Sequence, residues 1–268
     1  MLPEGTFAGR VAIITGGGAG IGEAITSELA RLGATTVILG RTREKLDAVC
    51  EAITLAGGTA RGHAVDVRDR DAVEAAFASV VAEFGRIDHL VNNAAGNFRI
   101  RPEEMSPNAW DAVVKIVLYG TWNCTQTAGR HMIERAGAVP CSTSAPRWRI
   151  KAARTVHSAS AKAGVLSMTK SLAAAWGQHG IRVNALIPGM TEGTGGALIP
   201  GMTEGTGGVE ALHRTEADPA EALARISLGR MLTKHELAHA ASYLLSDFAG
   251  YVTGAELVVD GGRSLGRL

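Results

Sequence analysis

Short apolar stretches alternate with longer amphipathic stretches along most of this chain. The apolar stretches have the length of buried strands, and in the segments between them apolar residues recur at helical spacing. The alternation favours βαβ units, which build a parallel sheet covered by helices on both faces. We therefore predict an α/β fold with a parallel sheet covered by helices, in one domain spanning residues 1–268. The predicted strands are residues 11–15, 36–39, 60–67, 87–91, 181–187 and 255–259, and the predicted helices are residues 21–32, 42–56, 69–84, 107–135, 156–178 and 234–245.

Two segments depart from this pattern. Residues 185–196 (ALIPGMTEGTGG) recur without change as residues 197–208, which indicates a tandem duplication inside a loop. A loop tolerates such an insertion because its closure entropy grows only slowly with length. Residues 139–154 stand where a buried central strand is expected, yet they contain two prolines and several cationic side chains, which such a strand tolerates poorly.

Composition narrows the possible classes of function. The 27 Lys and Arg residues nearly balance 26 Asp and Glu residues, so we expect neither a nucleic-acid partner nor an anionic membrane surface as a partner. The three cysteines (Cys50, Cys124 and Cys141) form no CxxC pair and are too few for a disulfide framework. No apolar run approaches the ~18 residues of a membrane span, and the first residues do not resemble a signal peptide. We therefore expect a cytoplasmic protein.

A glycine-rich turn (TGGGAGIG, residues 15–22) lies between the first predicted strand and the first predicted helix. The pyrophosphate of a dinucleotide needs a tight turn, backbone without Cβ atoms and free N–H groups at a helix N-terminus. Turns alone also collect glycines, but the flanking strand and helix favour nucleotide binding. The predicted cofactor-binding residues of this turn are Thr15, Gly16, Gly18, Gly20, Ile21 and Gly22.

The ends of the next two predicted strands indicate which nucleotide is bound. At the end of the second strand an acidic residue would hold a ribose 2′-hydroxyl, whereas an arginine can hold a 2′-phosphate. Arg41 is present there and no acid is, which favours NADP(H), although Arg41 could also be a solvated cation. Asp66 and Val67 end the third predicted strand and could meet the adenine ring, and Asp66 could equally cap the following helix.

Several spaced motifs together resemble the short-chain dehydrogenase/reductase family, and the resemblance covers nearly the whole chain. They are TGGGAGIG at 15–22, NNAAG at 92–96, a Ser/Ala-rich helix carrying Lys162, IRVNALIPG at 181–189 and VTGAELVVDGG at 252–262. The finer match is to 2,4-dienoyl-CoA reductases, through NNAAGNF at 92–98, SPNAW at 106–110, HSASAKAGV at 157–165 and SLAAAWG at 171–177. The resemblance implies a Rossmann fold, that is, a single doubly wound parallel sheet with helices on both faces, with its active site at the carboxyl ends of the strands.

The catalytic frame departs from that of the wider family. The usual pair is Tyr-x-x-x-Lys, but here Ser158 takes the tyrosine position, one helical turn before Lys162. Serine is a much weaker acid than tyrosine, so simple ketone reduction loses its proton donor. Dienoyl-CoA reductases also carry serine here. The resemblance therefore implies NADPH-dependent reduction of a conjugated (2,4-di)enoyl-CoA, with an acyl-CoA as substrate and a proton delivered to carbon through water.

The resemblance also implies roles for individual residues. Lys162 would bind the nicotinamide ribose and provide positive charge, while Ser158 and Asn97 would donate hydrogen bonds to the substrate. Ser158 could instead be a small residue packed on the sheet, and Asn97 could simply turn the chain. Further cofactor contacts are implied for Asn93, Ala94, Ala95, Pro188 and Gly189.

The same resemblance implies a mobile substrate-covering loop at about residues 189–213, which holds the duplication, and a homo-oligomer, either a tetramer or a dimer. It also exposes a departure that leaves other functions open. Dienoyl-CoA reductases place a tyrosine eleven positions before the serine, where this chain has Arg147, and the wider family's catalytic serine position holds Ala145. The alternatives are a trans-2-enoyl-CoA reductase, a broader short-chain dehydrogenase, or a catalytically impaired nucleotide-binding homologue.

One short motif points to different chemistry. Residues 235–239 (HELAH) match the H-E-x-x-H pattern of zinc proteases. Three fixed residues arise often by chance, and no other motif supplies a third ligand. We therefore expect no metal.

Overall fold

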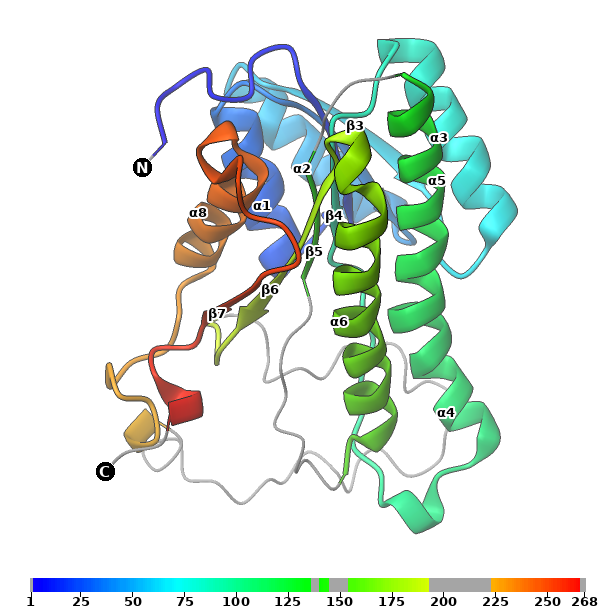
Figure 1. Ribbon diagram of the computed structural model, residues 1–268, viewed down its shortest axis with the longest axis vertical. Helices are drawn as coiled ribbons and strands as arrows, with labels where there is room; N and C mark the ends of the chain where they lie inside the picture. The colour runs from blue at the N-terminus through cyan, green and yellow to red at the C-terminus, as the bar shows by residue number, and fades with distance from the viewer. Residues whose placement is uncertain (1, 136–139, 145–153, 193–222, 266–268) are drawn as a thin grey trace.

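The computed structural model describes residues 2–135, 140–144, 154–192 and 223–265. Within these ranges the strands form one seven-stranded parallel sheet in the order β3-β2-β1-β4-β5-β6-β7 (Figure 1). The chain first builds outward from β1 to β3 and then returns to add β4 on the other side of β1. This reversal makes the sheet doubly wound and confirms the predicted fold class. The strands are β1 Val11–Thr15, β2 Thr35–Gly40, β3 Thr59–Ala64, β4 His89–Asn92, β5 Pro140–Ser144, β6 Arg182–Pro188 and β7 Glu256–Val259.

The helices alternate with the strands as the hydrophobic pattern predicts. The long stretch expected as one helix over residues 107–135 is interrupted at its centre by a five-residue π-helical segment, η2. The helix predicted over residues 156–178 is α6. It ends at Trp176, because a short 3₁₀ turn begins at Gly177. The α-helices are α1 Gly20–Arg31, α2 Arg43–Leu55, α3 Arg70–Phe84, α4 Pro107–Val114, α5 Gly120–Glu134, α6 Val156–Trp176 and α8 Lys234–Leu245, and η2 is Lys115–Tyr119.

The central strands are buried on both faces, which explains their continuous apolar sequences. In β1 every residue is buried, with Val11 and Ile13 packed into one hydrophobic cluster and Ala12 and Ile14 into another. The first cluster lies under α3, α5 and α6, and the second under α1 and α8. Figure 1 shows these two groups of helices on opposite sides of the sheet.

The prediction for the third strand is wrong at its carboxyl end. The sequence pattern predicts residues 60–67, but β3 ends at Ala64. The Val65 N–H still bonds to the Gly40 carbonyl oxygen at 2.8 Å, and the chain then turns, with the Asp69 N–H bonding to the Asp66 carbonyl oxygen at 3.0 Å. Asp66 and Val67 therefore belong to the connection that leads into α3.

At the amino end of the sheet, a buried carboxylate joins three arginines. The Asp88 side chain is fully buried and accepts a hydrogen bond from the Val11 N–H at 2.8 Å. Arg86 donates to both of its oxygens, Arg135 donates at 3.3 Å, and Arg10 lies 3.9 Å away. Burial raises the pKa of Asp88, but the bonds from Arg86 and Val11 outweigh burial and hold the pKa below its usual value.

The described helices give no indication of a membrane span, since none of them is both long and apolar enough to cross a bilayer.

Candidate active site

The glycine turn after β1 forms the first part of the site. Gly16 and Gly20 adopt positive φ angles of 66° and 61°, a conformation that residues with a Cβ rarely take. Helix α1 begins directly after the turn, and its N-cap residue is Ala19, whose methyl group cannot accept a hydrogen bond from the first turn. The backbone N–H groups at this end of α1 therefore remain available to an anionic ligand.

Gly22 brings α1 very close to the turn. A Cβ atom on Gly22 would overlap the Gly16 carbonyl oxygen and would lie 2.5 Å from Nδ2 of Asn93. A Cβ atom on Gly18 would meet less crowding, since its nearest atom would be Cδ2 of Leu46 on α2 at 3.2 Å. Gly22, predicted from the sequence as a cofactor contact, is therefore needed for the close packing of α1 against the turn.

Hydrogen bonds join this turn to the end of β4. The Thr15 hydroxyl accepts from the N–H groups of Asn93 at 3.0 Å and Ala94 at 2.9 Å. The Asn93 side chain donates to the carbonyl oxygens of Thr15 and Gly16. Ala94 and Ala95 are partly buried against the core beside it. The structure thus brings Thr15, Gly16, Asn93 and Ala94 together at the carboxyl ends of the paired strands β1 and β4. This is the switch point, where ligands bind in doubly wound sheets.

These features fit the diphosphate part of a dinucleotide. The turn has positive-φ glycines, a close approach that excludes side chains at Gly22, and uncapped helix N–H groups. Ile21 is partly buried and packs against the core behind the turn.

The carboxyl ends of β2 and β3 form the next part of the site. Arg41 follows β2 and is exposed. The Asp66 carboxylate accepts hydrogen bonds from the side chain and backbone of Arg68. Val67 is buried, and its carbonyl oxygen accepts from Nδ2 of Asn123 on α5 at 3.0 Å. Arg68 was not predicted as a site residue, because its pairing with Asp66 depends on β3 ending at Ala64 and on the turn that follows.

Helix α6 carries the Ser–Lys pair on a face that is turned into the protein. Ser158 is 3% exposed and Lys162 is 8% exposed, one turn apart. Burial lowers the pKa of Lys162 to about 8, because the charged ammonium group loses its hydration. Both members of the pair therefore lie on the buried face of α6.

The loop after β4 packs against the start of α6. The Ile100 N–H donates to the Arg154 carbonyl oxygen at 2.9 Å, and the rings of Phe98 and His157 meet edge to face with centroids 4.6 Å apart. Burial lowers the pKa of His157, against an opposing effect of the Thr155 backbone. This contact holds Asn97, next to Phe98, near the residue that precedes Ser158. Oδ1 of Asn97 is buried, and no described residue donates a hydrogen bond to it.

The end of β6 lies against the end of β7. The Gly189 N–H bonds to the Val259 carbonyl oxygen at 2.8 Å, and a Cβ on Gly189 would lie 2.7 Å from Cα of Asp260. Pro188 pairs with Val259 in the sheet. Gly189 is thus required by the close contact with the chain that leaves β7.

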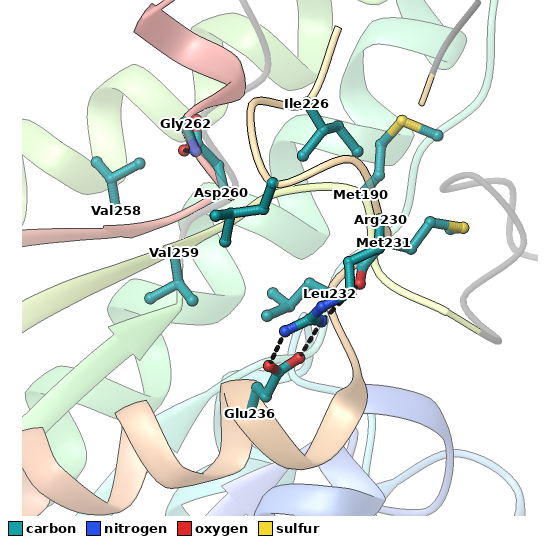
Figure 2. Close-up of a pocket in the computed structure, with 12 residues that line it drawn as sticks. Met190, Ile226, Arg230, Met231, Leu232, Glu236, Val258, Val259, Asp260 and Gly262 are labelled. Atoms are coloured by element: carbon teal, nitrogen blue, oxygen red, sulfur yellow. Dashed lines mark hydrogen bonds and ion pairs between the residues drawn. The ribbon is translucent and has the colours of Figure 1, made fainter. Parts of the chain in front are cut away.

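A cavity of about 220 Å³ lies beside this end of β6 (Figure 2). Apolar side chains, among them Met190, Ile226 and Val259, line much of it, and none of Ser158, Lys162 and Asn97 does. Figure 2 shows the guanidinium group of Arg230 paired with the carboxylate of Glu236 at its edge. The cavity therefore lies beside the candidate active site, and the predicted catalytic side chains are not part of its lining.

The H-E-x-x-H motif has a structural use in the described region. Glu236 forms a capping box with Thr233 at the start of α8 and pairs with Arg230, and these bonds lower the pKa of Glu236 to about 2. Residues 2–135, 140–144, 154–192 and 223–265 contain no group of three His, Cys, Asp or Glu side chains that could hold a metal ion. Ala145, Arg147 and most of the expected loop at 189–213 lie outside the described residues.

The fold and the site define an oxidoreductase of the short-chain dehydrogenase/reductase class. The features that do so are the doubly wound parallel sheet, the glycine turn after β1 and the buried Ser–Lys pair on α6. Over residues 16–264 the chain matches the family described as "Enoyl-(Acyl carrier protein) reductase", and it belongs to that family.

Individual relatives agree with this assignment. The chain is 40% identical over 259 residues to a probable 2,4-dienoyl-CoA reductase of Bacillus subtilis, a match that covers 96% of this chain and 97% of the relative. It is also 40% identical to a peroxisomal 2,4-dienoyl-CoA reductase of Pongo abelii, over 96% of this chain and 84% of that protein. The crystal structure of a short chain dehydrogenase from Bacillus anthracis superimposes with a TM-score of 0.87 at 39% identity, covering 98% of this chain and 99% of that one.

Proposed function

We propose that the protein is an NADPH-dependent reductase of conjugated enoyl-CoA thioesters, with 2,4-dienoyl-CoA as its substrate class. The observation that carries the proposal is the buried pair of Ser158 and Lys162, in which serine stands where ketone-reducing relatives need a phenol. The similarity to the two dienoyl-CoA reductases supports the same substrate class.

The cofactor part of the proposal is supported by the switch-point geometry. The turn at Gly16 and the first N–H groups of α1 would hold the pyrophosphate, and Arg41 would hold a 2′-phosphate. Asn93, Ala94 and Ala95 would line the nucleotide, and Pro188 and Gly189 would face the nicotinamide ring. When bound, NADPH supplies a hydride to the far end of the conjugated system.

The chain's own residues would stabilise the negative charge that develops on the thioester oxygen. Ser158 and Asn97 would donate hydrogen bonds to that oxygen, which is the kind of electrostatic support that lowers a barrier most. Lys162 would bind the nicotinamide ribose and supply a positive field. At neutral pH this lysine is largely protonated, since its pKa of about 8 lies above that pH.

The same residues explain why a plain ketone should be a poor substrate. A carbonyl oxygen that gains a full charge needs an acid of suitable pKa, and the hydroxyl of Ser158 does not provide one. Proton delivery to carbon through water has no such requirement.

The test is steady-state NADPH oxidation with a 2,4-dienoyl-CoA, a 2-enoyl-CoA and a 3-ketoacyl-CoA side by side. We expect preference for the dienoyl substrate. Ser158→Ala should lower kcat/KM, with a loss of transition-state stabilisation of roughly 1–3 kcal/mol, because the thioester oxygen loses one hydrogen-bond donor. Ser160→Ala, on the exposed side of the same helix, is the matched control and should change little.

Two results would overturn the proposal. Preference for the 3-ketoacyl substrate would assign ordinary carbonyl reduction to the site. No turnover of any substrate by a folded, NADPH-binding protein would favour the impaired homologue that Arg147 suggests.

A further inference from the structure

One carboxylate lies at the end of the site where the 2′-phosphate would bind. β2 and β3 run side by side to their carboxyl ends, where Gly40 pairs with Ala64. Arg41 follows β2, and Asp66 follows β3 by two residues. The positive charge of Arg41 reaches Asp66 and contributes to lowering the pKa of that carboxyl. The two groups therefore share one electrostatic environment.

Arg68 donates hydrogen bonds to both oxygens of the Asp66 carboxylate. Its Nε lies 3.0 Å from both Oδ1 and Oδ2 of Asp66, its Nη2 lies 2.5 Å from Oδ2, and its backbone N–H donates to Oδ1 at 3.0 Å. A bidentate guanidinium–carboxylate pair is among the stronger and more specific ion pairs in proteins. The pair is only partly exposed, with side-chain exposures of 41% for Arg68 and 26% for Asp66, so solvent screens it incompletely.

The ion pair matters for a ligand that carries extra negative charge. A ribose 2′-phosphate is strongly anionic, whereas a 2′-hydroxyl is neutral. An unpaired Asp66 would repel the phosphate and offset the attraction of Arg41, whereas it would not repel a neutral hydroxyl. With Asp66 paired, the charge of Arg41 is left for the ligand.

We propose that Arg68 is a specificity-determining residue, which favours NADPH over NADH by neutralising Asp66 beside the 2′-phosphate position. This inference rests on the proposed use of NADPH. It assigns the choice of nucleotide to two arginines, one that contacts the phosphate and one that removes a competing charge.

The test measures dissociation constants for NADPH and NADH by calorimetric titration, without substrate. Arg68→Ala should weaken NADPH binding about tenfold and leave NADH within about twofold, as expected for one partly screened unit charge. The double variant Asp66→Asn/Arg68→Ala should recover the parent's ratio of NADPH to NADH dissociation constants, because the repelling carboxylate charge is absent. Arg61→Ala is the matched control: it removes one positive charge from β3, where Arg61 pairs with Glu83 at 2.8 Å, and should leave the ratio unchanged.

The inference is wrong if Arg68→Ala weakens both nucleotides equally, which would indicate a contact with the adenine or a structural role. It is also wrong if the double variant Asp66→Asn/Arg68→Ala has a native circular dichroism spectrum but does not recover the parent's ratio of NADPH to NADH dissociation constants. Arg41→Ala separates this failure from that of the proposed function. A ratio that responds to Arg41 but not to Arg68 overturns only the inference, and a ratio that ignores Arg41 overturns the 2′-phosphate assignment itself.

Discussion

The side-chain amide of Asn93 donates a hydrogen bond to the carbonyl oxygen of Gly16 at 3.2 Å. These residues are 77 positions apart in the sequence and follow two adjacent strands, β1 and β4. A second bond from the same amide, to the Thr15 carbonyl oxygen at 3.1 Å, fixes the turn at both of its first residues. The shape of the glycine turn therefore depends on the end of β4 as well as on its own sequence.

Replacing Gly22 with alanine should damage this junction. The new methyl group would meet the Gly16 carbonyl oxygen and the Asn93 amide, both closer than 3 Å, and the Gly16 oxygen belongs to backbone that cannot easily move. We expect a loss of about 1–3 kcal/mol in the free energy of unfolding, as for other overpacked sites, together with loss of nucleotide binding. Urea denaturation and nucleotide titration measure the two effects.

Gly177→Ala is the matched control for that substitution. Gly177 has a φ of −54°, and nothing lies within 4 Å of the place that a methyl group would take, so alanine fits without strain. This variant should be as stable as the parent or gain up to about 1 kcal/mol through the unfolded state. Equal stability of the Gly22 and Gly177 variants would contradict the crowding argument.

Arg41→Ala should discriminate between the two nicotinamide dinucleotides. Removal of the guanidinium group should weaken NADPH binding by about 1.5–3 kcal/mol, the range for hydrogen bonds to charged groups, while NADH binding barely changes. Titration of both nucleotides into parent and variant gives the answer. An equal loss for both would rule out a contact with the 2′-phosphate.

Lys162 should make the ligand-free protein less stable at neutral pH than at high pH. Its pKa of about 8 lies below the usual 10.5, so between these values the unfolded chain binds more protons than the folded protein and stability rises with pH. Below pH 8 the full penalty for burying the charge is present. Lys162→Met should therefore stabilise the fold at pH 7, by on the order of 2–3 kcal/mol, and lose this advantage near pH 10.5. It should also abolish activity.

Denaturant unfolding at pH 7, 9 and 10.5 tests this expectation. Lys170→Met on the same helix is the control, because Lys170 is 62% exposed and paired with Glu256. A stabilisation of the Lys162 variant that did not depend on pH would point to improved packing and not to the charge.

Asp88 should contribute to stability above its unfolded pKa. Its pKa is held below the usual value in the folded protein, so the contribution is present above about pH 4 and is lost as the pH falls through the folded pKa. Asp88→Asn leaves Arg86 without its buried partner and should cost about 3–5 kcal/mol at pH 7. The variant should also lose stability less steeply in acid. Asp247→Asn, 89% exposed and 3.8 Å from Arg10, should have little effect on either measurement.

Deleting residues 197–208 should leave the melting temperature nearly unchanged and alter KM for the acyl-CoA. The first copy of the repeat provides residues 185–188 of β6, which pair with β7, so the described sheet is retained. A shorter loop changes the closure free energy by about 0.5 kcal/mol or less. A collapse of thermal stability would show that the second copy is structural.

The two copies also provide a matched pair of substitutions. Leu186, in the first copy, is 2% exposed in β6, and Leu198 occupies the same place in the second copy. Leu186→Ala should cost about 2–5 kcal/mol, as for other buried leucines, and Leu198→Ala should cost much less. Equal costs would mean that both copies are part of the core.

The class of fold and much of the candidate site follow from the order of the amino acids alone. Alternating buried strands and amphipathic helices have few ways to pack, so the hydrophobic pattern was enough to predict a parallel sheet covered on both faces, and the spaced motifs identified it as doubly wound. The glycine turn at 15–22 and the four-residue spacing from Ser158 to Lys162 are local features, and local geometry follows directly from local sequence. The structure places the turn at the junction of β1 and α1, and both Ser158 and Lys162 in α6.

Contacts between residues distant in the chain become visible only once the chain is folded. The bonds from Asn93 to the glycine turn, the three arginines around Asp88 and the contact of Phe98 with His157 each join separate elements. Even the short-range pairing of Arg68 with Asp66 was hidden, because it depends on β3 ending at Ala64 and the chain turning there. Side-chain partners across a sheet are set by strand order and register, and hydrophobic periodicity carries neither.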